Sequence, residues 1–223
     1  MTIGFFHVDT PTKVSETARR CAMGLVLSVR KVMPYAKIVH FTDQTTQQIG
    51  GVDMVRRKPS EPMGLLRLRH NSGVEGEWVF TDTDVLFQLP VRDVFKCEFD
   101  IAVTRRDWSH LKPAGGFSDR MPFNTGVVFS RCPRFWQEAY TRLRNLDPNQ
   151  QEWMGEQQAI CETAAETDRY HVRYLKGSKY NFPPVVPGMK PPAYQLESEA
   201  CILHYKGPKR KQMMLKRIRE MSI

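Results

Sequence analysis

The sequence predicts an α/β protein whose central sheet is mostly parallel and is flanked by helices. Strand and helix signals alternate through the first half of the 223 residues, which is the order that builds parallel sheets. Several apolar strands also end in acidic residues, and such sheets bind ligands beyond the carboxyl ends of their strands. The length suits one globular domain with a full core.

The first strand and the first helix have the clearest signals. Residues Ile3 to Val8 form an apolar strand, and Thr10-Pro11 then has the pattern of a helix N-cap followed by proline at the first helical position. Pro34 ends the helix. One core-facing stripe at helical spacing lies between the two prolines: Ala18, Cys21, Ala22, Leu25, Val26 and Val29.

The next elements continue the alternation. We expect strands at Lys37 to Phe41 and Met54 to Arg57, a helix at Met63 to His70, and a buried strand at Trp78 to Phe80. Predicted strands are each followed by an acid: Asp9, Asp43 and Asp82. Because parallel strands end at one edge of a sheet, we expect all three acids to line that edge.

The second half of the chain is less regular. Residues Arg105 to Arg120 contain proline and paired glycines, and we expect them to form a long loop that closes over a substrate. Two amphipathic helices are expected, one after Pro133 and one at about Trp153 to Ala165. The remaining strands are expected at Phe99 to Val103, Val127 to Ser130, Tyr170 to Leu175 and Ala200 to Tyr205.

The composition is that of a soluble folded protein, with 41% apolar and 26% charged residues. No apolar run approaches the ~20 residues that span a bilayer, and the N-terminus lacks a basic segment followed by an apolar stretch. We therefore expect a cytoplasmic protein. The five cysteines are scattered without a Cys-x-x-Cys pair, which predicts reduced, mostly buried thiols.

The formal net charge of +9 is concentrated near residue 223. Apolar residues are interleaved with the basic ones there, so we divide the chain into a domain at 1–205 and a basic amphipathic tail at 206–223. The tail is either a solvated surface helix or a binding segment for a lipid surface or nucleic acid. A lipid partner would place the protein at the inner membrane surface. The basic residues are Lys206, Lys209, Arg210, Lys211, Lys216, Arg217 and Arg219.

The pair Asp82 and Asp84 ends a buried strand, which has no packing reason to end in acids. Two aspartates at i and i+2 can bind one divalent cation, and oxygen ligands suit Mg²⁺ or Mn²⁺. Such an ion keeps positions open for the phosphates of a nucleotide. Asp-x-Asp is also common in solvated turns, so the triplet alone leaves both interpretations open.

Six segments, preceded by a helix and strand between Ser28 and Asp43, occur in the order found in one enzyme family. With them the chain resembles the nucleotide-sugar glycosyltransferases of the GT-A fold, most closely the retaining glycosyltransferase family 8. The resemblance implies a GT-A (Rossmann-like) domain over nearly the whole chain. The segments are Arg67-Leu68, Val79 to Val85, Phe123 to Val128, Glu156 to Ile160, Lys179 to Phe182 and Ile202 to Gly207.

Two positions depart from the family pattern. Glu156 stands where the family has aspartate, and Pro208-Lys209-Arg210-Lys211 replaces its Lys-Pro-Trp. The chain is also shorter than typical relatives, so the acceptor region is expected to be reduced.

The resemblance implies a metal site made of Asp82, Asp84 and His204, with Mn²⁺ or Mg²⁺ as the cofactor. The ion would neutralise charge on the diphosphate leaving group. His204 is otherwise a satisfied histidine at a strand end. Gly207, Lys209 and Arg210 follow it, and the two cations are expected to contact the β-phosphate unless they belong only to a solvated tail.

The resemblance places further donor-binding residues along the chain. Arg67, with Arg69 as the competing choice, is expected at the donor phosphates or sugar. Asp9, with His7 and Thr10 nearby, suits an imide N–H of the base or a ribose hydroxyl. Asn124 would orient sugar hydroxyls, or is a plain turn residue. The residues beside these, Thr83 and Thr125, complete the expected donor site.

Glu156 and Gln157 are the candidate catalytic residues implied by the resemblance. Retention through a covalent intermediate needs a carboxylate nucleophile, whereas retention without one needs a polar group at the oxocarbenium face. Gln157 suits the second role. Glu156 either binds a sugar hydroxyl or is an acid stabilised by the helix dipole.

The leading hypothesis is a metal-dependent transferase that uses a UDP-sugar and retains configuration. Its partners would be the nucleoside-diphosphate sugar and an anionic acceptor, either a membrane lipid glycan or a modified base in nucleic acid. Two alternatives remain: a basic nucleic-acid-binding module on a degenerate transferase fold, and a sugar-1-phosphate nucleotidyltransferase. The first alternative predicts loss of the Asp pair, which is intact, and the second needs a Gly-rich loop that His7 to Pro11 do not form.

Overall fold

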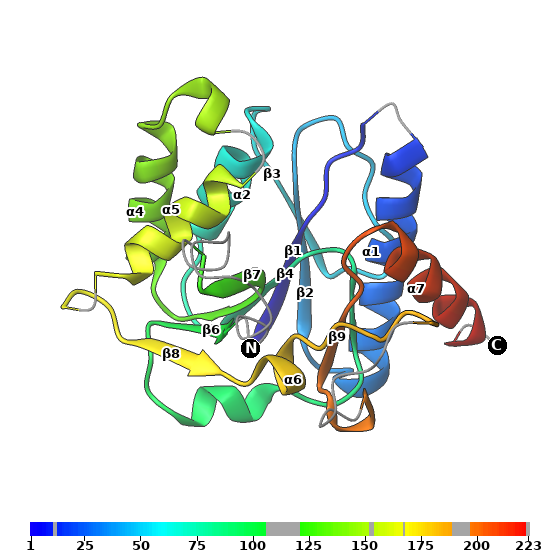
Figure 1. Ribbon diagram of the computed structural model, residues 1–223. Helices are drawn as coiled ribbons and strands as arrows, with labels where there is room; N and C mark the ends of the chain where they lie inside the picture. Colours follow the sequence, from blue (N-terminus) through cyan, green and yellow to red (C-terminus); the bar gives the residue numbers. More distant parts are fainter. Residues whose placement is uncertain (11–12, 106–120, 152–153, 167, 189–196, 222–223) are drawn as a thin grey trace.

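A computed structural model describes the chain except residues 11–12, 106–120, 152–153, 167, 189–196 and 222–223 (Figure 1). The expected N-cap at Thr10-Pro11 and the expected loop at 105–120 therefore fall partly or wholly outside the described residues. The first elements alternate as predicted: β1 (Thr2–Phe6), α1 (Lys13–Val32), β2 (Lys37–Thr42), β3 (Met54–Arg57), α2 (Met63–Asn71), β4 (Trp78–Thr81) and β5 (Val85–Phe87).

The later elements include short helices that the sequence does not predict. In chain order they are η1 (Arg92–Lys96), β6 (Ile101–Arg105), β7 (Phe123–Ser130), α4 (Pro133–Arg144), η3 (Pro148–Gln150), α5 (Gly155–Ala164), β8 (Val172–Leu175), α6 (Gly177–Tyr180), η4 (Glu197–Glu199), β9 (Ile202–His204) and α7 (Pro208–Met221).

The main sheet has seven strands in the order β3-β2-β1-β4-β7-β6-β8. β7 runs antiparallel to both of its neighbours, and the other pairings in this sheet are parallel. The predicted mostly parallel sheet is therefore confirmed. Strands that run in the same direction bring their carboxyl ends to one edge, where ligands of such sheets bind.

Helices cover both faces of this sheet. Figure 1 shows α1 and α7 on one side and α2, α4 and α5 on the other. The α1 stripe predicted from the sequence packs on the first face, where Leu25, Val26 and Val29 join Ile3 and Val79 in one core. A second core on the opposite face contains Phe80, Trp136 and Ala159. Each face is covered because strands with apolar residues on both sides need a helix layer on each.

β7 begins earlier than the sequence predicts, at Phe123 rather than Val127. All eight of its residues are buried between β4 and β6, so Asn124 lies inside a strand and not in a turn. The pairing with β6 shifts register between Val103 and Thr104. The apolar pattern did not predict the start of β7, because Asn124 and Thr125 are polar. Their backbone pairing rather than their hydrophobicity keeps them in the sheet.

A second, two-stranded sheet places the segment around His204 next to Asp82 and Asp84. β5 and β9 pair antiparallel, with Val85 opposite His204. The Tyr205 backbone N–H also donates to the Asp84 carbonyl oxygen (2.8 Å). Residues distant in sequence thus meet beside the carboxyl end of β4.

α7 packs on α1 and on this small sheet. Met214 and Leu215 are buried together with Cys21, Leu86 and Leu203. All five cysteines are free, and Cys97 is exposed. Among the helices that the structure describes, none has the length and apolarity needed to cross a membrane.

Candidate functional site

The acidic residues predicted to share one edge of the sheet do so. Asp9 follows β1, Asp43 follows β2 and Asp82 follows β4. β1 pairs in parallel with both β2 and β4, so the three strands end at the same edge. Two polar clusters form along it, one at Asp82 and one at Asp9.

Asp82, Asp84 and His204 form a compact cluster. Their nearest ligand atoms all lie within 4.8 Å of one another, and Asp84 and His204 are buried. The His204 Nε2 atom is 3.2 Å from Asp84 Oδ1 and 3.5 Å from Asp82 Oδ2. Two carboxylates and an imidazole are a donor set that Mn²⁺ or Mg²⁺ accepts, so these residues fit a divalent ion.

The approach of β7 to this cluster requires a glycine. A Cβ atom on Gly126 would lie 2.1 Å from His204 Cε1 and 2.7 Å from Asp82 Oδ2. The Gly126 carbonyl oxygen meanwhile accepts the Asp82 backbone N–H (2.8 Å). The backbone of β7 therefore forms one wall of the cluster and holds Asp82 in place.

A chain of hydrogen bonds sets the orientation of His204. The Gly126 N–H donates to Asn124 Oδ1 (2.8 Å), so that atom is an oxygen. Asn181 Nδ2 donates to the same oxygen (3.0 Å) and to Thr104 Oγ1 (2.7 Å). The Asn181 Oδ1 atom therefore faces His204 Nδ1 at 2.7 Å and accepts its proton. With Nδ1 bonded to Asn181, Nε2 is the His204 atom that faces the two carboxylates.

Asn181 was missed as a site residue by the sequence reasoning. The segment Lys179 to Phe182 carried the family resemblance, but no role followed from it. Its partners Thr104, Asn124 and His204 come from three separate strands, so only the fold brings them together.

Asp84 is charged despite its burial. Burial alone would raise the pKa of the Asp84 carboxyl, but His204 and Lys211 outweigh burial and lower that pKa to about 2. Lys211 Nζ lies 3.3 Å from Asp84 Oδ2. Opposite charges within a few ångströms favour the ionised acid.

Lys211 is thus the basic residue of α7 at the cluster, rather than the predicted Lys209 or Arg210. Arg210 Nε donates to the Pro184 carbonyl oxygen (2.8 Å), and Lys209 is exposed. The turn at Gly207, whose φ is 80°, precedes α7, and the orientation of α7 about its axis decides which of three consecutive cations faces inward. A run of basic residues in the sequence does not predict that orientation.

Arg67 connects the cluster of Asp82, Asp84 and His204 to the candidate catalytic residues. Its Nη1 donates to Asp82 Oδ1 (2.9 Å), its Nη2 donates to the Thr125 carbonyl oxygen (3.2 Å), and its Nε lies 3.3 Å from Glu156 Oε1. Burial raises the pKa of Glu156, and Arg67 opposes that effect. Arg69, the competing choice in the sequence, instead approaches Glu61 (3.4 Å).

Gln157 lies in the first turn of α5, next to Glu156. Its Nε2 donates to Met121 Sδ (2.9 Å), a weak acceptor that leaves most of the amide's hydrogen-bonding capacity unused. Thr83 is half-buried between the two aspartates, and the Thr125 side chain is buried in β7. The expected residues Asp82, Asp84, His204, Arg67, Glu156 and Thr125 are therefore in one contact network.

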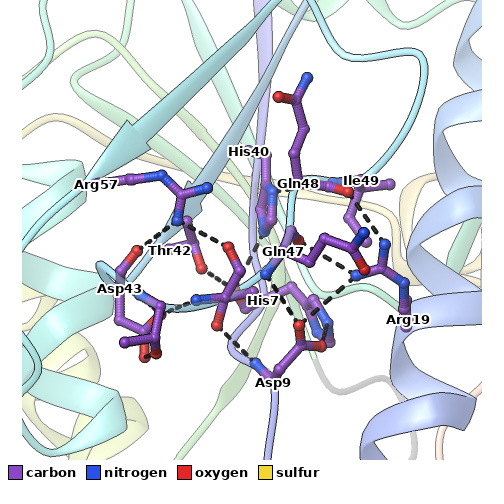
Figure 2. Close-up of polar contacts among 12 residues, drawn as sticks. His7, Asp9, Arg19, His40, Thr42, Asp43, Gln47, Gln48, Ile49 and Arg57 are labelled. Atoms are coloured by element: carbon purple, nitrogen blue, oxygen red, sulfur yellow. Dashed lines mark hydrogen bonds and ion pairs between the residues drawn. The ribbon is translucent and has the colours of Figure 1, made fainter.

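His7 and Asp9 form the second cluster, at the end of β1 (Figure 2). His7 Nε2 lies 3.0 Å from Asp9 Oδ1. Burial lowers the pKa of His7, although Asp9 opposes this. Burial would raise the pKa of Asp9, but the Gln47 N–H and His7 lower it. A neutral imidazole therefore donates to an ionised carboxylate.

Residues 43–49 form a loop that two arginines hold from opposite sides (Figure 2). Arg57 Nη1 donates to the carbonyl oxygens of Asp43 (3.0 Å) and Thr46 (2.7 Å). Arg19 donates to the carbonyl oxygens of Gln47 (3.2 Å) and Gln48 (3.1 Å). We call this segment the clamped loop.

Side chains and backbone also tie the clamped loop to β1 and β2. The Gln47 N–H donates to Asp9 Oδ2 (3.1 Å), and the Asp9 N–H donates to Thr46 Oγ1 (2.8 Å). His40 donates from Nε2 to the His7 carbonyl oxygen (3.1 Å), and its Nδ1 accepts the Ile49 N–H (3.5 Å). Both Asp9 oxygens therefore have protein partners, and the loop is fixed in advance of any ligand.

No protein-family model matches the sequence, and no curated protein matches it either. Solved structures do match in fold. The galactosyltransferase LgtC in complex with donor and acceptor sugar analogs has a TM-score of 0.64 at 14% identity, over 100% of this chain and 95% of that one. An LgtC variant with an active-site glutamine changed to glutamate has a TM-score of 0.58 at 14% identity, over the same shares of both chains.

A glycosyltransferase involved in the glycosylation of the major capsid of PBCV-1 is similar over its whole length. The TM-score is 0.57 at 16% identity, over 99% of this chain and 100% of that one. At these identities the similarity establishes fold. The chain has the GT-A fold of these glycosyltransferases, as its motifs predicted.

Proposed function

We propose that the protein is a metal-dependent glycosyltransferase that takes a sugar from a nucleoside-diphosphate sugar, with UDP-sugars as the first donors to test. One observation carries the proposal. Asp82, Asp84 and a His204 whose Nε2 atom faces them are assembled at the carboxyl edge of a GT-A sheet. A degenerate binding module would have no reason to keep all three residues and the hydrogen-bond chain behind His204.

Asp82, Asp84 and His204 would hold Mn²⁺ or Mg²⁺, which supplies Lewis-acid stabilisation of a diphosphate leaving group. Lys211 adds a cation beside Asp84, where it is available to phosphate oxygens. Arg67 holds Asp82 and Glu156 in fixed positions. The clamped loop and Asp9 form the wall that we assign to the nucleoside.

We infer that Gln157, rather than Glu156, faces the reacting sugar carbon, in a reaction with retention. Glu156 is ion-paired with Arg67 (3.3 Å), and an arginine that holds the carboxylate in this way lowers its nucleophilicity. Among the described residues, the hydrogen-bond partner of the Gln157 amide is the Met121 sulfur, so its oxygen is available to stabilise developing positive charge. The active-site glutamine of LgtC supports this assignment.

We propose a hydroxyl of a glycan as the acceptor. LgtC, which shares the fold, has been solved with an acceptor sugar analog. The net charge of +9 favours an anionic acceptor, such as a lipid-linked glycan. Glucosylation of a modified base in duplex DNA is the competing outcome.

The test is release of UDP from a panel of UDP-sugars with Mn²⁺, with and without glycan or modified-DNA acceptors. We compare the parent with Asp84→Asn and with Asp93→Asn, an exposed aspartate outside the cluster. Release from one sugar, lost on chelation and in Asp84→Asn but kept in Asp93→Asn, is the expected result. Whichever acceptor, glycan or modified DNA, accelerates the release of UDP identifies the acceptor class of the protein.

Calorimetry tests donor binding without an acceptor, so it remains informative if the panel lacks the right acceptor. Parent protein should bind Mn²⁺, and UDP should bind more tightly with Mn²⁺ present. If neither Mn²⁺ nor UDP binds, the transferase assignment is wrong.

A further inference from the structure

α1 presents a solvent-facing stripe that the fold leaves uncovered. Its exposed side chains recur every three or four residues, which places them on one side of the helix. Met23 and Leu27 are 46% and 45% exposed at the centre of this stripe, and Tyr35 just beyond the helix is 100% exposed. Among the side chains of α1 that the structure describes, from residue 16 onward, the exposed ones are Glu16, Arg20, Met23, Leu27 and Lys31.

α7 lies beside α1 and extends this surface (Figure 1). A Cβ atom on Gly24 would meet the Ile218 side chain, so the two helices are in close contact. Met214 and Leu215 of α7 face inward and are buried. Its outward side chains are therefore polar and mostly basic: Lys209, Gln212, Lys216, Arg219 and Glu220. We call the exposed residues of both helices, with Tyr35, the α1/α7 face.

The two helix layers differ in how many of their basic residues form ion pairs. On α4 and the segment after α5, three arginines pair with glutamates: Arg134 with Glu138, Arg142 with Glu166, and Arg169 with both glutamates. Arg144, at the exposed end of α4, has no ion pair among the described residues. On the α1/α7 face, no ion pair among the described residues engages Arg20, Lys31, Lys209 or Lys216. Among the described residues of this face, the acids are Glu16 and Glu220, so the described part of the face is net positive.

We propose that the α1/α7 face docks the protein on an anionic lipid surface. Exposed Met23 and Leu27 would enter the boundary between headgroups and acyl chains, and the basic residues around them would attract the anionic headgroups. Tyr35, with an apolar ring and a polar hydroxyl, suits the same boundary. A nucleic acid backbone would satisfy the cations but offers nothing to the apolar stripe, so the lipid surface fits both features.

The role of α7 differs from that of a free amphipathic tail. Its apolar side is already used inside the protein, so α7 contributes charge and α1 contributes the apolar contact. α7 also begins beside the metal cluster, since Lys211 contacts Asp84. If the proposed transferase function holds, docking on this face keeps that cluster near acceptors anchored in the same membrane.

The experiment is co-sedimentation of the full chain with vesicles of phosphatidylcholine alone and with about a third phosphatidylglycerol. The parent should bind the anionic vesicles, and binding should weaken as salt is raised. Met23→Gln/Leu27→Gln and, separately, Arg20→Gln/Lys31→Gln should each reduce the bound fraction at least fivefold. Both pairs are exposed, so their melting temperatures should stay close to that of the parent.

Two matched controls test the location. Met63, on α2 of the opposite layer, is 59% exposed, and Met63→Gln should bind vesicles like the parent. Arg134→Gln changes a cation on that same layer and should also bind normally. Equal binding by all variants, no binding by the parent, or binding to duplex DNA in preference to anionic vesicles would overturn the proposal. These readouts need no turnover, so they stand apart from the test of transferase activity.

Discussion

Asn181 determines which nitrogen of His204 faces Asp82 and Asp84. Its amide is itself oriented by Asn124, whose oxygen is fixed by the Gly126 N–H. A buried residue outside the group of Asp82, Asp84 and His204 thus sets which ring nitrogen of a candidate metal ligand faces the two acids. Groups that orient metal ligands in this way contribute strongly to metal affinity.

Replacing Asn181 should therefore weaken metal binding. We expect Asn181→Ala to reduce Mn²⁺ affinity by about 10–100-fold, because His204 loses the acceptor that holds its Nδ1 proton. Titration calorimetry measures the change. Asn145→Ala, at the exposed end of α4, is the control and should bind Mn²⁺ like the parent. Unchanged affinity in Asn181→Ala would show that His204 needs no such partner.

Two buried histidines predict how stability depends on pH. Burial lowers the pKa of His40 and of His70 to about 4 from 6.5, so in both cases the unfolded chain binds protons that the folded protein does not. The free energy of unfolding is therefore not reduced by these two histidines above pH 6.5. It falls as the pH drops from 6.5 toward 4. The loss is on the order of 2–3 kcal/mol for each residue.

Urea unfolding at pH 7.5, 5.5 and 4.5 measures this loss. The pKa of Asp84 is lowered to about 2, so its own contribution is lost only at more acidic pH. His171→Gln, at an exposed histidine, should show the same profile as the parent. A midpoint that is flat from pH 7.5 to 4.5 would contradict the prediction.

At this scale the sequence predicted Asp82, Asp84 and His204 together because family motifs carry them. It did not predict Lys211, because three consecutive cations differ only in where the helix turns them. The partners of Asp9 were also hidden, since its contacts are backbone groups of a loop whose side chains carry no pattern.

Among the elements, the clamped loop shows how irregular backbone becomes rigid. Arg57 and Arg19 donate to four of its carbonyl oxygens, and hydrogen bonds from a charged donor are stronger than those between neutral groups. Asp43 adds an internal turn by accepting the Thr46 N–H (2.7 Å). A loop held this way needs little further ordering when a ligand binds.

Loosening the clamped loop should lower nucleotide affinity. We expect Arg57→Met to weaken UDP binding about tenfold, because the loop beside Asp9 must then be ordered by the ligand. Calorimetry with Mn²⁺ present measures the change. The control is Arg30→Met, since Arg30 also donates to loop carbonyls, those of Ala36 and Gly51, away from the site. If both variants lose UDP affinity equally, the effect is general destabilisation and not the loop.

Periodic elements were predicted closely, and β7 was not. α1, α2 and α4 follow their apolar stripes, because burial of one helical side dominates their position. β7 starts four residues before its apolar run, where paired backbone holds polar residues at the site. The pairing of β9 with β5 also lies beyond any local pattern, since it joins segments that are far apart in the sequence.

At the scale of the whole molecule, α7 is part of the fold rather than an appendage. Met214 is fully buried with Cys21 and Leu86, and Arg217 bonds to Gln88 Oε1 (2.5 Å) and pairs with Glu197. These contacts join α7 to α1, β5 and the segment before β9. These contacts cross the boundary that we placed at residue 205.

A chain that ends at residue 205 should be much less stable than the longer one. Removing α7 exposes Cys21, Leu86 and Leu203, and losing even one buried Met or Leu side chain costs about 2–5 kcal/mol. Thermal unfolding measures the loss, and Met214→Ala should show part of it. Equal melting temperatures for the two chains would show that α7 is only peripheral.

The pairing of β5 with β9 has a consequence for synthesis on the ribosome. Asp82 and Asp84 are translated long before His204 and Lys211. The growing chain emerges from its amino-terminal side, so β4 and the two aspartates leave the ribosome ahead of β9 and α7. It cannot complete the metal cluster until β9 and α7 have left the exit tunnel. A nascent polypeptide thus carries the two aspartates without the imidazole, and ribosome-bound intermediates should show no tight manganese binding.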